Sequence, residues 1–429
     1  MSNNRKRRDT FGGAFDTATA ELPKKLFADA LDKKLKEKGI RLSQNRLNRM
    51  AVSALKGEPI NFKTFFERIK KALGMEVKEV VIEFNDDDTE AVKNAADELI
   101  KKLPKVLHEL IESAPPDLLV ALKKDWAREK RLQAGDKFGF TKRLHKRWGK
   151  GLDLLEMSIT IAREIGSNIN TDLRTAHTTP KLVDVLTRLH ARGCQIAEEI
   201  VCLLQNGFSD GAMARWRTLY EIAVVSSLLH EHGEDLAERY VAHEVIESAK
   251  AAKLFQKHHD RLGQTAMSSE EIADIEQQRD ALIAKYGKEF GGSYGWAAKH
   301  LNIQSPTFAQ LVEAAKIDHL SPYYKMASHN VHANPKGIFF KLGHIGESEV
   351  LLAGPTNAGL ADPGHGTAIS LMQITTALAL VNPTIDDVIG MKILDLLQVE
   401  IGDALVDSHV QLKLDEESRA RNAVGGSVK

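Results

Sequence analysis

The chain has 429 residues, of which 43% are hydrophobic and 28% charged, a composition typical of a globular protein with a solvated surface. Basic and acidic residues both number 59, which excludes an overall charge excess favouring nucleic acid or anionic lipid, so any such binding must come from a local patch. The two cysteines, Cys194 and Cys202, predict reduced thiols in the cytoplasm rather than a disulfide framework. The apolar segment 368–381 is too short and polar to span a membrane, so no membrane partner is expected.

The first 115 residues predict a small, mostly helical unit behind a disordered tail. The tail, residues 1–20, contains a basic run followed by two glycines. Residues 21–115 form the unit, in which apolar residues recur at helical spacing over 26–38, 44–55 and 61–73. One short strand is expected at 79–84 and a helix at 89–103, with a break at Pro115-Pro116.

Residues 116–150 are rich in lysine, arginine and tryptophan, and predict a basic helical arm. One interpretation is a helix whose charges are simply solvated. The alternative is a stripe that faces nucleic acid, with bases stacking on four aromatic side chains between the charges: Trp126, Phe138, Phe140 and Trp148.

Residues 151–412 predict a C-terminal helical bundle domain, and residues 413–429 a flexible tail. Helices are expected at 152–165, 181–206, 211–231, 235–259, from 268 onward, and at 307–315, 322–329, 368–380 and 384–397, with a polar loop at 166–180. Two apolar runs near 338–352 predict a β-hairpin inserted between helices. The fold class is therefore mainly α: a helical bundle with a small N-terminal unit and one hairpin insertion.

Charged residues in an otherwise apolar helix form the first candidate site. Arg217 and Glu221 lie one turn apart, just before a segment that is apolar on almost every face. Burying such a pair is costly unless the two charges bind each other or a third group. The pair predicts either an internal ion pair between helices or a cavity in which Arg217 holds an anion and Glu221 holds a donor or a metal.

The next helix carries Tyr240 and His243 on a broad polar face, which makes them candidates for ligand binding. His243-Glu244 begins like a zinc-protease motif, but position 247 is glutamate, and a metal ligand is therefore missing. No histidine has a glutamate three residues before it, as a di-iron bundle would require. The sequence therefore predicts neither a metal nor a cofactor.

The segment from Ser328 to Pro335 places polar groups at the end of an apolar helix. Ser328 and His332 are one turn apart and could act as nucleophile and base, although no orienting acid is evident. Lys325 precedes His332 by six intervening residues, a spacing similar to the Arg-x(4–6)-His signature of HEPN-type helical ribonucleases. Lysine lacks the planar fork of arginine, so this chain departs from that signature.

Residues 185–335 resemble the uncharacterised bacterial domain-of-unknown-function family 5677. The resemblance rests on Gly211, the run Arg217-Thr-Leu-Tyr-Glu221, Tyr240, and Ser328-x-x-x-His332 with Asn334. It implies an all-helical cytoplasmic domain in which Arg217, Glu221 and His332 gather near one site, with no established activity. The similarity to HEPN-type proteins is weaker.

Our leading functional hypothesis is an RNA-binding protein or HEPN-like, metal-independent endoribonuclease in stress or phage defence. His332 would be the acid and base, Lys325 or Arg217 would hold phosphate, Glu221 would orient them, and Ser328 completes the catalytic set. Tyr240, His243 and Asn334 join Arg217 as ligand-binding candidates. The HEPN analogy also implies a homodimer. The alternatives are a non-catalytic interaction scaffold and a sensor of an anionic small ligand, so enzymatic activity stays open.

Overall fold

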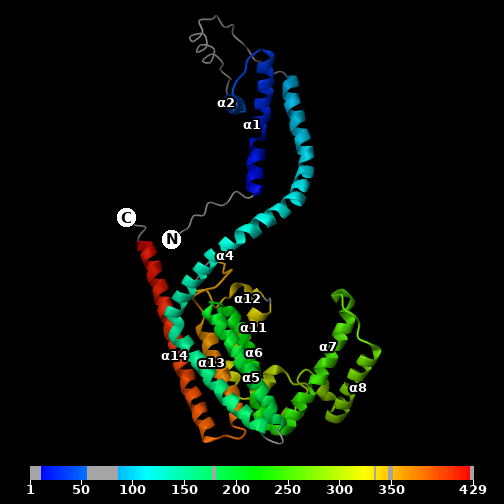
Figure 1. The fold of residues 1–429 in the computed structure, drawn as a ribbon, viewed down its shortest axis with the longest axis vertical. Coiled ribbons are helices and arrows are strands. Elements are labelled where there is room, and N and C mark those ends of the chain that lie inside the picture. Colours follow the sequence, from blue (N-terminus) through cyan, green and yellow to red (C-terminus); the bar gives the residue numbers. More distant parts are fainter. Residues whose placement is uncertain (1–10, 56–85, 176–179, 333–334, 346–350, 426–429) are drawn as a thin grey trace. The chain divides into compact units, whose positions relative to one another are not determined.

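A computed structural model describes residues 11–55, 86–175, 180–332, 335–345 and 351–425 (Figure 1). Contacts between Cα atoms divide the chain into two compact units, residues 1–131 and 132–429. All regular elements in the described ranges are helices, so the mainly α class is confirmed. None of these helices combines the length and the apolar composition that crossing a membrane requires.

The first unit contains α1 (Phe11–Glu37), α2 (Gln44–Leu55) and the start of α4 (Asp86–Thr175). Its small core forms where α1 packs on α2 through the buried side chains of Ala28, Leu31, Leu35, Leu47 and Ala51. These residues recur every three or four positions, which gives each helix one apolar face. Because α1 begins at Phe11, the helix enters the segment expected to be a disordered tail. The helix expected at 61–73 and the strand expected at 79–84 lie outside the described residues.

Helix α4 continues through Pro104, Pro115 and Pro116, so the break expected at Pro115-Pro116 is absent. Both of these prolines are exposed. A proline removes a backbone donor and can bend a helix without ending it, because water reaches the carbonyl that is left over. The helix also covers 166–175, which the sequence predicted as part of a polar loop, because Ile165 and Ile169 pack against the core.

The second unit is a bundle of the C-terminal half of α4 with α5 (Lys181–Gln205), α6 (Ser209–Ala242), α13 (Ala361–Ala379) and α14 (Ile385–Gly425) (Figure 1). Helix α13 lies at its centre and packs against α5, α6 and α14. Small residues allow this approach: a Cβ on Gly366 would lie 2.9 Å from the indole Nε1 of Trp216. Helix α14 continues to Gly425, into the segment expected to be a flexible tail.

Helices α7 (Glu244–His258) and α8 (Ser269–Tyr286) pack together as a helical hairpin, joined through η1 (Asp260–Leu262). The start of α8 follows the sequence prediction, because Ser268 and Glu271 form a reciprocal capping box. The predicted division between helices 211–231 and 235–259 appears as a kink inside α6. Gly233 has φ 72° and ψ −149° there, a conformation that is essentially restricted to glycine.

Short elements connect this hairpin to the centre of the bundle. They are η2 (Lys288–Gly291), α9 (Ala298–Leu301), α10 (Phe308–Ala314), η3 (Asp318–Leu320), α11 (Ser321–Val331) and α12 (Pro335–Phe339). Helices α10 and α11 both pack on α6. This packing brings the end of α11 towards the first half of α6, where the candidate charges lie.

The β-hairpin predicted at 338–352 is wrong for the residues that the structure describes. Ile338 and Phe339 belong to α12, and 340–345 and 351–352 are irregular. Pro335 presets the first helical turn, and the N–H of Phe340 donates to the carbonyl of Lys336 at 2.9 Å. The apolar run does not form a core strand, because the side chains of Ile338 and Phe339 are exposed.

Candidate functional site

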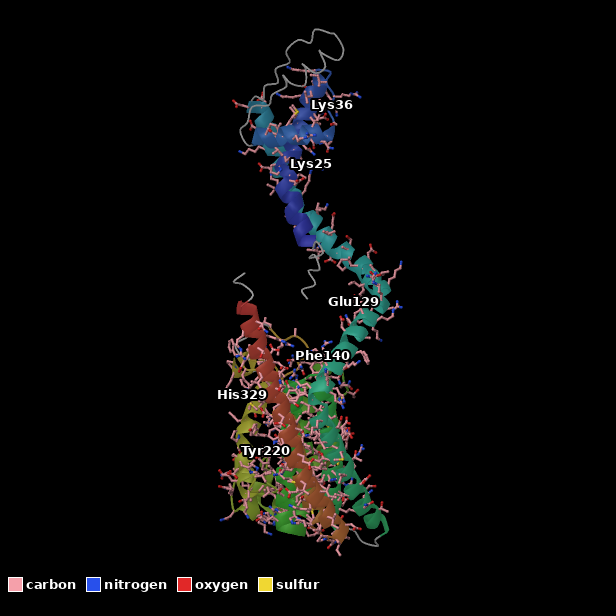
Figure 2. The ribbon with its side chains drawn as sticks, turned by 90° about the vertical axis from the view of Figure 1, so that its left-hand side faces the viewer. Lys25, Lys36, Glu129, Phe140, Tyr220 and His329 are labelled. Atoms are coloured by element: carbon pink, nitrogen blue, oxygen red, sulfur yellow. The ribbon has the colours of Figure 1, made fainter. Side chains whose placement is uncertain are left out.

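Helices α6 and α11 together carry the candidate site, and Figure 2 marks them with Tyr220 and His329. On α6, Trp216 and Tyr220 are buried in the core, and Tyr220 donates to the carbonyl of Ile317 at 2.9 Å. Arg217 and Glu221 each follow one of these aromatic residues, at the margin of the buried face. Their side chains are 23% and 38% exposed, so both charges remain reachable from solvent.

Tyr324 of α11 joins the two charges. Its hydroxyl accepts a hydrogen bond from Nη2 of Arg217 at 2.9 Å and donates to Oε1 of Glu221 at 2.7 Å. Nε of Arg217 lies 3.3 Å from the same carboxylate oxygen, as an ion pair without good hydrogen-bond geometry. The guanidinium carbon is 4.8 Å from the centroid of the Tyr324 ring. These contacts fix the guanidinium along two of its edges.

The surroundings of Tyr324 hold its hydroxyl in the neutral form. Burial strongly raises the pKa of Tyr324, and its hydrogen bond to Glu221 raises it further, whereas Arg217 acts in the opposite direction. Tyr294 also has a raised pKa, first from burial and then from the charge of Glu221. The hydroxyl of Tyr324 therefore stays protonated near neutral pH and can serve as a donor.

His332 terminates α11 beside this network. Its backbone leaves the helix in an extended conformation, while its N–H still donates to the carbonyl of Ser328 at 3.1 Å. Nε2 of the exposed imidazole lies 3.5 Å from Nη1 of Arg217. Because a guanidinium can only donate, Nε2 of His332 can form a hydrogen bond with Nη1 of Arg217 only as the acceptor. Arg217, Glu221 and His332 therefore lie together, in the arrangement that the family resemblance implies.

The other residues predicted on α11 do not join this network in the described part of the chain. Ser328 Oγ donates to the carbonyl of Tyr324 at 2.9 Å, an ordinary bond within the helix rather than a contact with the imidazole of His332. Lys325 is exposed, and no hydrogen bond or ion pair joins it to Arg217 or His332. Asn334 lies outside the described residues.

Tyr240 and His243 occupy a separate cluster near the end of α6. The ring of Tyr240 meets Trp296 edge-on at 5.1 Å, and burial raises its pKa. Nε2 of His243 is 2.8 Å from the carbonyl of Gly292, and its ring meets Phe290 at 5.2 Å. Burial lowers the pKa of His243, so the imidazole is a neutral donor to that carbonyl. These contacts give both residues a packing role.

Asp210, which the sequence analysis did not select, fixes the end of α11. Its Oδ1 accepts hydrogen bonds from Nδ2 of Asn330 at 3.2 Å and from the N–H of Leu342 at 3.1 Å. The carboxylate thus ties the residues on both sides of His332 to the first turn of α6. Tyr324 was missed as well, although it lies four residues before Ser328 and eight before His332 and therefore shares their helix face.

The donor set of the site suits an anion. In the described ranges no group of three or more histidine, cysteine, aspartate or glutamate side chains could hold a metal ion. Glu221 already accepts from Tyr324 and faces Arg217, whose positive charge would repel a cation. His332 is exposed, and Nη1 of the partly exposed Arg217 lies 3.5 Å from its imidazole.

The basic arm does not present the four aromatic side chains expected of a stacking stripe. Trp148 is fully buried, with its indole N–H donating to Oδ1 of Asn357 at 2.9 Å, and Phe140 packs against the core of the second unit. Trp126 and Phe138 are exposed. The stacking interpretation is therefore wrong for Trp148, which belongs to the bundle core.

Comparison with known proteins finds one family model that matches the part of the chain that carries the site. Residues 183–349 match the model of a family of unknown function, DUF5677, which confirms the resemblance found at 185–335. The matched range includes all of α6 and α11 and therefore every described residue of the site. No curated protein and no solved structure matches the chain.

Proposed function

We propose that the DUF5677 domain of this chain binds an RNA phosphodiester at Arg217 and His332 and cleaves it without a metal. The observation that carries the proposal is the 3.5 Å approach of Nη1 of Arg217 to Nε2 of His332 at an exposed position. A cationic donor beside an imidazole lone pair supplies the two functions that such a cleavage needs, charge stabilisation and proton transfer.

Arg217 is prepared to bind a phosphate. Glu221 and Tyr324 hold its Nε and Nη2 sides, which leaves Nη1 directed at His332. A phosphate oxygen that enters between Nη1 and the imidazole would replace a weak nitrogen acceptor with an anionic one, and charge-assisted hydrogen bonds of this kind are short and strong. Because the guanidinium is already oriented, little side-chain entropy is lost on binding.

The proposed reaction is an internal transesterification. Nε2 of His332 accepts the proton of the ribose 2′-hydroxyl while the 2′-oxygen attacks phosphorus. The bond from phosphorus to the 5′-oxygen breaks, a 2′,3′-cyclic phosphate forms, and the imidazolium returns the proton to the leaving 5′-oxygen. Arg217 stabilises the charge that accumulates on the phosphate oxygens. Atoms and electrons balance without water or a redox partner.

Glu221 and Tyr324 act as positioning residues in this proposal, because both contact the guanidinium rather than the reacting atoms. Tyr324→Phe would keep the ring against Phe308, 4.9 Å away, but remove the hydroxyl that joins Arg217 to Glu221. We therefore expect this variant to raise KM for RNA more than it lowers kcat. Ser328→Ala should leave both parameters unchanged, because its hydroxyl is engaged within α11.

The decisive experiment incubates the full chain with fluorescently labelled single-stranded RNA in EDTA. We expect cleavage that leaves 2′,3′-cyclic phosphate ends, a loss of at least 100-fold in His332→Ala, and a strong loss in Arg217→Lys, which keeps the charge but not the fork. His319→Ala is the matched control, since His319 is an exposed histidine on the short turn before α11.

Two results would contradict this proposal. The first is a purified wild-type chain that neither binds nor cleaves RNA. The second is cleavage that survives His332→Ala while thermal unfolding confirms that the variant is folded.

A second candidate is an anion sensor or scaffold, favoured by the way Tyr324 already forms hydrogen bonds with both Arg217 and Glu221. In that case Arg217→Ala would cost roughly 1–3 kcal/mol of stability by leaving partners unpaired, and the wild type would not cleave RNA. Stabilisation by inorganic phosphate in a thermal melt would identify a sensor, and its absence would indicate a scaffold.

A further inference from the structure

Helix α14 has two apolar faces, and only one of them is covered in the second unit. The inner face packs into the bundle through Leu394, Leu397, Ile401, Leu405 and Leu412, all of which are buried. The outer face exposes Ile385, Val388, Ile389, Ile393, Leu396, Val399, Val406, Val410 and Leu414. Helix α14 runs along the near side of the second unit in Figure 2, in orange to red. A contiguous exposed apolar surface of this length is typical of a site that binds another protein surface.

The spacing on the outer face is that of a coiled coil. Exposed residues alternate in steps of four and three along an outer seam formed by Ile385, Ile389, Lys392, Leu396, Val399, Asp403, Val406 and Val410. Residues spaced alternately by three and four positions allow the side chains of two helices to pack as knobs into holes. The seam covers about 38 Å of helix. Two of its eight members are charged, Lys392 and Asp403, and they determine which pairing is possible.

A two-fold antiparallel pairing places these two charges opposite each other. In that register Ile385 faces Val410 of the second copy, Ile389 faces Val406, Leu396 faces Val399, and Lys392 faces Asp403. Every layer is therefore either apolar on both sides or a pair of opposite charges. A parallel pairing would instead set each lysine against a lysine and each aspartate against an aspartate, which is unfavourable.

Neither the local ion pair nor the available area opposes this pairing. Nζ of Lys392 contacts Asp395 of its own helix at 2.5 Å, but both groups are exposed, and surface pairs of this kind contribute little and exchange readily. The exposed apolar side chains of the outer face amount to roughly 800 Å² per copy, so a pair would bury on the order of 1,500 Å², the size of a standard specific interface.

We infer that the chain forms a homodimer through the outer seam of α14, with the two helices antiparallel. The occupant of this surface is thus a second copy of the same chain. The inference is independent of the proposed ribonuclease activity, because α14 carries none of the residues of that site.

Light scattering after size exclusion tests the surface. We expect the full chain to run as a dimer at micromolar concentration and Leu396→Glu to run as a monomer with an unchanged helical circular dichroism spectrum, because the side chain is exposed. Leu254→Glu, an exposed leucine on α7, is the matched control and should remain dimeric. A monomeric wild type, or a dimer that survives Leu396→Glu, would overturn the inference.

Disulfide trapping tests the register. In a Cys202→Ser background, which removes the exposed native thiol, Ile389→Cys combined with Val406→Cys should give a covalent dimer on mild oxidation. Neither single variant should do so. Crosslinking by Ile389→Cys alone would indicate a parallel pair and overturn the assignment.

A charge exchange completes the test. Lys392→Asp and Asp403→Lys should each weaken the dimer at least tenfold, and the double exchange should restore it. If the losses of dimer affinity from the two single variants added up in the double variant, Lys392 would not lie opposite Asp403 of the second copy.

Discussion

The imidazole of His190 lies between α5 and α13, where its Nε2 is 3.2 Å from Oγ1 of Thr375. Because the threonine hydroxyl donates to the carbonyl of Leu371 at 2.8 Å, the imidazole must be the donor of the first bond. Burial lowers the pKa of His190 to about 4. The folded chain therefore keeps this histidine neutral at pH values where the unfolded chain binds a proton.

The stability of the protein should consequently fall as the pH drops from about 6.5 to about 4, by roughly 3 kcal/mol from His190 alone. Urea unfolding across this range measures the effect. His190→Gln, which can still donate to Thr375, should show a flatter profile by that amount. His319→Gln changes an exposed histidine and should keep the wild-type slope. Equal slopes in all three chains would contradict the assignment.

At this scale the sequence predicted part of the site. Arg217 and Glu221 stood out because charges are rare in an apolar helix, and His332 because it follows the last turn of one. Tyr324 escaped attention, since a tyrosine at helical spacing fits a core as well as a site. Spacing along one helix gives the face of a residue but not its neighbours, and for that reason Ser328 and Lys325 appeared equivalent to His332.

Helix α6 bends at Gly233, and the bend directs the chain towards the hairpin of α7 and α8. The backbone angles there, φ 72° and ψ −149°, are accessible to glycine and strained for any residue with a Cβ. No atom lies within 4 Å of an added Cβ, so the cost of a substitution at this position comes from the backbone rather than from packing.

Gly233→Ala should therefore destabilise the protein by about 1–3 kcal/mol. The matched control is Gly135→Ala, also without neighbours within 4 Å but inside the regular helix α4, where alanine should stabilise by up to about 1 kcal/mol. Chemical unfolding of both variants provides the comparison. If Gly233→Ala instead stabilised the protein and Gly135→Ala destabilised it, the bend would not be set by Gly233.

The sequence predicted helix starts well where the interactions that fix them lie within a few residues. The helices expected from 268 and from 307 begin one residue later, at Ser269 and Phe308, because Ser268 and Thr307 cap them through bonds that close within four residues. The hairpin at 338–352 was wrong because two apolar runs suit a strand or an exposed helix equally. Gly337 also lies where an added Cβ would be 2.1 Å from the carbonyl of His329, a close approach between α12 and α11 that sequence patterns do not show.

The two units each have a core of their own. One core forms between α1 and α2, and the other extends from Leu144 to Leu412. The sequence placed unit limits at 115 and 150, where composition changes, whereas the contacts divide the chain at 131, inside α4. Composition marks where charge increases along a helix, but packing determines where a compact unit begins.

Residues 132–429 should fold without the rest of the chain, because their core contains no residue of the first unit. A fragment with these limits should be helical by circular dichroism and unfold in one cooperative transition within a few degrees of the main transition of the full chain. A fragment that starts at 150 is the contrasting case: it lacks Leu144 and Trp148, both fully packed, and should unfold at lower temperature. Identical melting of the two fragments would contradict this division.

The burial of the tryptophans has a spectroscopic consequence. Trp148, Trp216 and Trp296 are buried in the second unit, whereas Trp126, the fourth tryptophan of the chain, is exposed in the first. Blue-shifted emission should thus report the second unit alone, and Trp126→Phe would remove the solvent-exposed background. Because Trp216 stacks on Tyr220 at 5.4 Å and Tyr220 meets Tyr324 of the site at 5.5 Å, a change in that emission would give a label-free titration of a ligand at the site.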